Sequence, residues 1–104
     1  HIAAGEAALS SVYPTARDRL TFPELLDEGF EPHKVREVWV MSREDADHFN
    51  DISEEDMETA LKALAAHTSQ VPPDAIERVR AWKSENGKAY NMKYAESFRT
   101  FTLR

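Results

Sequence analysis

The sequence lacks several residue types and patterns that common functions require. Its 104 residues include no cysteine and only three glycines. The absence of cysteine excludes disulfides and thiol chemistry and is typical of a cytoplasmic protein, which is the compartment we expect. The scarcity of glycine leaves no phosphate-binding glycine-rich loop, and no G-x-S-x-G nucleophile elbow occurs. Enzymes that depend on either motif are therefore excluded.

Long apolar runs and an excess of basic residues are also absent. No apolar stretch approaches the roughly 20 residues of a membrane span, so we expect no membrane partner. The net charge is −6, and nucleic acid is not an expected partner because its binding needs a basic patch. Hydrophobic residues make up 41% and charged residues 31% of the chain, which indicates a soluble globular protein.

Local patterns predict a helix, a long connection and a strand in the first part of the chain. Residues 2–12 form a helix with a small-residue face, which should end at Tyr13-Pro14 because the residue before proline avoids the helical region. Residues 14–34 are a long connection that includes one helical turn. Residues 35–41 contain the apolar run VWVM, which is typical of a strand covered on both faces in a parallel sheet.

Two helices are predicted in the second part of the chain. Ser53 is a candidate N-cap, and acidic residues follow it in the first turn, where the helix dipole favours them. Pro72-Pro73 separates this helix from the next, which Asn86-Gly87 should cap. The tail, residues 90–103, fits either a closing strand or a helical turn. The predicted apolar helix faces are Met57, Ala60, Leu61 and Leu64 in the first helix and Ile76, Val79 and Trp82 in the second.

Two features indicate a piece of a larger domain. The chain starts at His1 rather than at methionine and leads straight into a helical pattern. It also contains a single confidently predicted strand, which cannot form a sheet alone. We therefore expect residues 1–104 to be the C-terminal fragment of one domain, with its missing N-terminal half as a partner.

Few titratable side chains suggest a site. The four histidines (His1, His33, His48 and His67) show no i, i+4 zinc-binding spacing. Residues 45–51 hold three aspartates and His48, a set that could bind a cation. This segment follows the predicted strand, where α/β sheets place their ligands. It is either a solvated loop or the rim of a substrate site, with Asp47 and His48 as the candidate rim residues.

Seven short stretches, in this order and spacing, resemble the C-terminal half of the LmbE / PIG-L family, the de-N-acetylases that act on N-acetylglucosamine-type amides. The resemblance covers nearly the whole chain. The stretches are residues 1–9 (HIAAGEAAL), 12–18 (VYPTARD), 20–26 (LTFPELL), 31–39 (EPHKVREVW), 47–52 (DHFNDI), 67–70 (HTSQ) and 94–99 (YAESFR).

The resemblance implies a fold and a metal site. It implies an α/β, Rossmann-like fold with a mostly parallel sheet flanked by helices, incomplete in this chain. In the family, the last histidine of a His-Pro-Asp-His motif binds zinc, and His1 falls on that position. The other two ligands and the aspartate general base belong to an Ala-His-Pro-Asp-Asp motif that this sequence does not contain. The implied cofactor of the complete domain is Zn²⁺.

The resemblance also implies a function for the complete protein, which is zinc-dependent hydrolysis of an N-acetylated sugar-type substrate to acetate and a free amine. One histidine cannot hold a catalytic zinc ion, so we expect the isolated chain to be inactive. The alternative is a non-catalytic interaction module derived from the same fold, which binds a partner through exposed apolar side chains. Homo-oligomerisation is compatible with either function. The apolar side chains considered for the module are Phe22, Trp39, Trp82 and Phe98.

Overall fold

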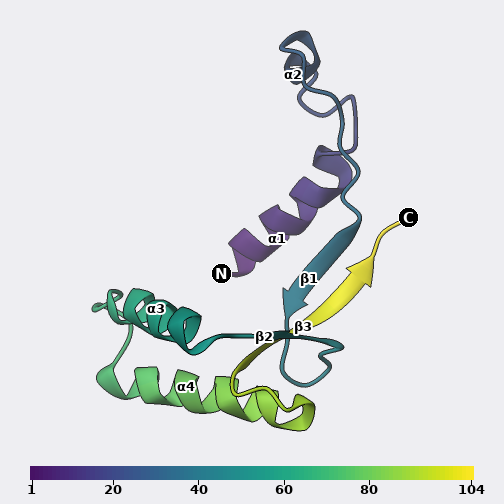
Figure 1. Ribbon diagram of the computed structural model, residues 1–104. Helices are drawn as coiled ribbons and strands as arrows, with labels where there is room; N and C mark the ends of the chain where they lie inside the picture. The colour runs from purple at the N-terminus through teal and green to yellow at the C-terminus, as the bar shows by residue number, and fades with distance from the viewer. The chain divides into compact units, whose positions relative to one another are not determined.

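The computed structural model describes all residues from 1 to 104 (Figure 1). The chain divides into two compact units. One unit comprises residues 1–38 together with 101–104, and the other comprises residues 39–100. None of the helices combines the length and the apolarity that a membrane crossing requires.

The first unit contains the predicted helix and the predicted long connection with its single helical turn. Helix α1 (Ile2–Ser10) runs into a π-helical turn, η1 (Ser11–Thr15), in which Tyr13 has an extended backbone (φ −151°, ψ 127°). The helix therefore ends ahead of the proline, for the steric reason given above. A single helical turn, α2 (Glu24–Asp27), interrupts the connection. Every residue of α1 is exposed, including those of its small-residue face.

The second unit is built on two helices that follow the predicted pattern. Helix α3 (Glu54–Ala65) begins at Ser53, whose side-chain oxygen accepts a hydrogen bond of 3.0 Å from the Asp56 amide. Helix α4 (Pro73–Gly87) begins at Pro73, where a missing amide proton costs nothing. The core of this unit consists of Met57, Leu61 and Tyr94, with Ile52, Ile76 and Val79 packed against it.

Helix α4 ends where predicted, but Gly87 has a different role from the predicted cap. Gly87 is the last helical residue and has an ordinary helical φ of −79°. A Cβ atom at this position would lie 2.2 Å from the carbonyl oxygen of Met92, so the close approach of the returning chain requires glycine. The left-handed residue is Asn91 (φ 54°), which follows the short 3-10 helix η2 (Lys88–Tyr90).

The sheet has three strands in the order β1-β3-β2 (Figure 1). They are β1 (Glu37–Met41), β2 (His48–Asp51) and β3 (Ala95–Thr102). Strands β2 and β3 are antiparallel, with His48 opposite Phe98 and Asp51 opposite Ala95. Strand β1 also runs antiparallel to β3, because the Leu103 amide donates to the Arg36 carbonyl and the Ser42 amide to the Ser97 carbonyl.

The predicted mostly parallel, Rossmann-like sheet is therefore wrong, although a strand does form within the predicted range 35–41, at Glu37–Met41. A short apolar run does not reveal the direction of its neighbours, and the neighbours come from two segments that the pattern left open or assigned to a loop. The tail supplies β3, and the end of the polar segment 42–51 supplies β2. Nor is β1 covered on both faces in this chain, since Trp39 and Val40 are each 43% exposed.

Candidate functional site

His1 occupies the N-cap position of α1, within the first unit. Its carbonyl accepts a 2.9 Å hydrogen bond from the Gly5 amide, while its side chain makes no capping hydrogen bond. The residue is exposed, so the imidazole nitrogens are accessible to a ligand from outside the chain. The candidate rim residues Asp47 and His48 belong to the second unit.

Both oxygens of the Asp47 carboxylate contact residues of β3. Its Oδ1 accepts hydrogen bonds from both the amide and the hydroxyl of Thr100, each at 2.9 Å. Its Oδ2 lies 3.4 Å from a guanidinium nitrogen of Arg99. The Thr100 amide is the main reason that the pKa of Asp47 lies below its ordinary value, and the Thr100 hydroxyl and the Arg99 charge act in the same direction. Through these contacts Asp47 links the residue that precedes β2 to strand β3.

His48 is held in a defined orientation on the sheet. Its ring packs against Trp39 with a centroid separation of 4.4 Å, and its Nε2 lies 2.8 Å from Oδ1 of Asn50. Asn50 is two residues further along β2, on the same face of the strand. With the Asn50 oxygen as acceptor, Nε2 carries the proton and Nδ1 is left as an acceptor. Of the two candidate rim residues, His48 is thus the one whose side chain retains a ring nitrogen as a hydrogen-bond acceptor.

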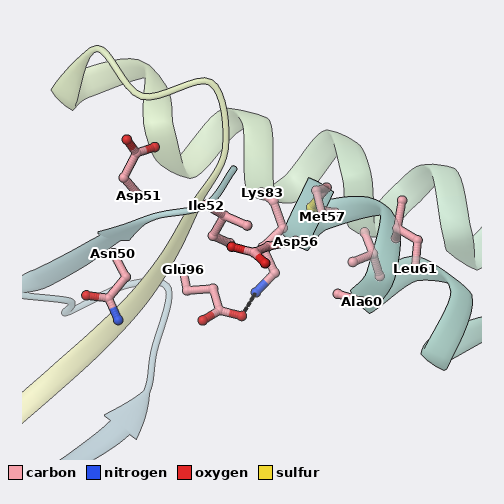
Figure 2. A pocket seen from close by; sticks show the side chains of 10 residues that line it. Asn50, Asp51, Ile52, Asp56, Met57, Ala60, Leu61, Lys83 and Glu96 are labelled. Atoms are coloured by element: carbon pink, nitrogen blue, oxygen red, sulfur yellow. Dashed lines mark ion pairs between the residues drawn. The ribbon is translucent and has the colours of Figure 1, made fainter. Parts of the chain in front are cut away.

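A pocket of about 450 Å³ lies within the second unit, between β2, β3 and the two helices (Figure 2). In Figure 2 the Lys83 and Glu96 side chains face each other, and their charged atoms are 3.5 Å apart. Lys83 is only 20% exposed, and Met57 and Leu61 form part of the apolar wall. The volume is in the range of small-molecule pockets. The lining residues are Asn50, Asp51, Ile52, Asp56, Met57, Ala60, Leu61, Val79, Lys83 and Glu96.

The carboxylates of residues 45–51 do not converge on a common point. Asp45 accepts a hydrogen bond from the Ser42 hydroxyl, Asp47 is bound to Thr100, and Asp51 lines the pocket described above. No group of three or more His, Cys, Asp or Glu side chains lies close enough together to hold a metal ion. Residues 45–47 lie in the loop ahead of β2 and residues 48–51 form the strand, and the acidic side chains of this segment have separate surroundings.

Three residues at these sites, Asn50, Lys83 and Glu96, were not predicted from the sequence. Asn50 could have been found from its alternation with His48, but only if β2 had been recognised as a strand. Glu96 lies in the tail, for which the sequence fits either a strand or a helical turn. Lys83 has no sequence feature that indicates a site, because an isolated lysine on a helix is usually solvated. Their pairing depends on the packing of α4 beside β3.

Comparison with known proteins adds no assignment: no protein-family model matches the chain, and no curated protein matches it. The resemblance to N-deacetylases therefore rests on the motifs quoted above.

Proposed function

We propose that this chain contributes to a zinc-dependent hydrolase that removes N-acetyl groups from N-acetylglucosamine-type amides. The observation that carries the proposal is the series of seven motifs, in order and at fitting distances, from His1 to Arg99. The compartment that we propose is the cytoplasm.

The residues of this chain do not by themselves fit a catalytic zinc ion. Such an ion usually takes three protein ligands, and no suitable group of side chains occurs here. His1 supplies at most one ligand. We therefore assign no catalytic step to these residues and propose that the remaining ligands come from the N-terminal half of the same domain. On this proposal the isolated chain does not hydrolyse the substrate.

The test begins with the coding sequence that precedes the His1 codon. We expect it to encode His-Pro-Asp immediately before His1 and Ala-His-Pro-Asp-Asp further upstream. The protein from that reading frame should release acetate from an N-acetylglucosamine derivative, lose this activity to a chelator and regain it with zinc. His1→Ala should lower its zinc affinity by more than about tenfold, the low end of what loss of a mere supporting residue costs.

Lys62→Ala is the control, because Lys62 is equally exposed, lies on α3 and belongs to none of the seven stretches. This variant should keep full zinc content and activity. A protein that binds no zinc, or a reading frame without the two motifs, would refute the deacetylase proposal.

A second candidate function is an interaction module without catalysis. The observation that favours it is the exposure of three large aromatic side chains, which is 54% for Phe22, 43% for Trp39 and 36% for Trp82. Phe98 is half-buried against Trp39, with ring centroids 5.6 Å apart. Ultracentrifugation discriminates the two functions, because a module should be folded and monodisperse without metal. A molten or aggregated chain would count against the module.

A further inference from the structure

A second pocket, of about 400 Å³, lies entirely within the unit formed by residues 1–38 and 101–104. Two backbone hydrogen bonds fix the segment that forms its wall. The His33 amide donates to the Ala16 carbonyl at 2.7 Å, and the Leu103 amide donates to the Arg36 carbonyl at 2.8 Å. The pocket is thus built on an anchored backbone. The lining residues are Val12, Tyr13, Arg17, His33, Lys34, Val35, Arg36, Leu103 and Arg104.

The lining of this pocket is basic and contains no carboxylate side chain, although the chain as a whole has a net charge of −6. Seven of the thirteen lysines and arginines form ion pairs with acidic side chains elsewhere in the protein. Of the six that do not, four line this one pocket. The six are Arg17, Lys34, Arg36, Arg43, Lys62 and Arg104.

Arg17, Lys34 and Arg36 are exposed at this pocket, and no acidic side chain forms an ion pair with them. Acidic side chains outnumber basic ones by nineteen to thirteen, so neighbouring pairs of opposite charge form readily, as they do elsewhere on the molecule. Like charges that share a concave surface repel one another, and an anion placed among them removes that repulsion. Arg104 is the last residue of the 104-residue chain, and its main-chain carboxylate offsets its side-chain charge. The cations that count are therefore Arg17, Lys34 and Arg36, which lie in the interior of the sequence.

The side chains also indicate which anion fits. An arginine guanidinium matches two oxygens of a phosphate at once, and a lysine ammonium adds a point charge. Apolar surface from Val12, Val35 and Leu103 lines the same pocket. The Tyr13 ring completes it, with the Arg17 guanidinium carbon 5.9 Å from the ring centroid. A ligand that carries a phosphate and an apolar or ring-shaped group would use both kinds of surface.

We propose that this pocket binds an organic phosphate, namely a soluble phosphate ester whose ring or alkyl group lies against Tyr13 and the apolar side chains. Recognition comes from side-chain cations, so it does not need the glycine-rich loop that the sequence lacks. The site goes beyond the proposed deacetylase function, since it uses neither His1 nor zinc.

Titration calorimetry of the 104-residue chain with phenyl phosphate at low salt tests the proposal. We expect saturable binding that weakens with added salt, with inorganic phosphate weaker and phenol not binding. Arg17→Gln and Arg36→Gln should each weaken phenyl phosphate binding about tenfold or more, as expected for loss of a hydrogen bond to a charged group. Lys62→Gln removes one unpaired cation outside the pocket and should leave the affinity unchanged.

Two further measurements test whether the variants are folded and where the ligand binds. Circular dichroism establishes that each variant is folded, and amide chemical-shift changes on titration should concentrate at residues 12–17 and 33–36. Absence of phenyl phosphate binding at millimolar concentration, or equal loss in Lys62→Gln, overturns the proposal. Binding to vesicles that contain phosphatidic acid, without binding to phenyl phosphate, overturns the soluble ester in favour of a lipid headgroup. None of these readouts depends on zinc or on deacetylation.

Discussion

The contacts of Asp47 lead to a prediction about pH. The Thr100 amide, followed by the Thr100 hydroxyl and the Arg99 charge, holds the pKa of this carboxyl below its ordinary value. A carboxyl whose pKa is lower in the folded state stabilises that state above its unfolded pKa of about 3.9. This contribution is lost as the pH falls through the lowered pKa. Asp47→Asn should therefore lower the urea midpoint at pH 7, and the difference from the unmodified protein should shrink in acid.

Asp51→Asn is the matched control for that comparison. Asp51 lies at the other end of β2, is also exposed, and its carboxylate makes no hydrogen bond within the chain. Urea unfolding followed by circular dichroism from pH 2 to pH 7 measures both variants. An equal fall of the midpoint in the two variants, or a pH-independent difference for Asp47→Asn, would contradict the assigned role.

Ser53 is the N-cap of helix α3, and its contribution to stability can be tested by removing its hydroxyl group. The Ser53 hydroxyl satisfies the amide of Asp56, one of the first-turn amides that have no partner within the helix. Ser53→Ala should lower the free energy of unfolding by about 1 kcal/mol, the usual cost of losing such a cap. Ser69→Ala is the control, because Ser69 is exposed in the turn after α3, and it should change stability by less than about 0.5 kcal/mol. Equal effects of the two substitutions would show that the cap is not what stabilises α3.

The two units of the molecule differ in how much they bury. All the residues that are buried to the core level, including Met57, Leu61 and Tyr94, lie in the unit of residues 39–100. In α1, by contrast, Ile2 is 82% and Leu9 56% exposed. Local opening costs least where few apolar contacts must be broken. Amides of α1 should therefore exchange with deuterium orders of magnitude faster than those of α3 and α4 in the isolated chain.

Hydrogen exchange read out by mass spectrometry or NMR measures this difference. Equal protection of the amides in α1 and α3 would contradict the prediction. Another surface would then have to cover the exposed residues of α1. On the deacetylase proposal, the N-terminal half of the domain also packs against α1, so its addition should slow exchange in α1 selectively.

Local sequence patterns determined the parts of the fold that depend on near neighbours. Ser53 and Pro73 mark the starts of α3 and α4, and Tyr13 before Pro14 stops α1, because caps and steric restrictions act within a few residues. The spacing of Met57 and Leu61 likewise identified the face that the structure buries. These elements could be read from the sequence without knowledge of the rest of the chain.

The tertiary structure alone decided the direction of the strands and the surroundings of the candidate site residues. The short run at β1 fits a parallel or an antiparallel sheet, and its partner β3 follows only after both long helices. Asp47 contacts Thr100 and Lys83 contacts Glu96 across many residues of sequence, and Arg17 and Arg36 line one pocket although they are far apart in the chain. Such pairings depend on how distant segments of the chain pack together, and local sequence patterns contain no information about that packing.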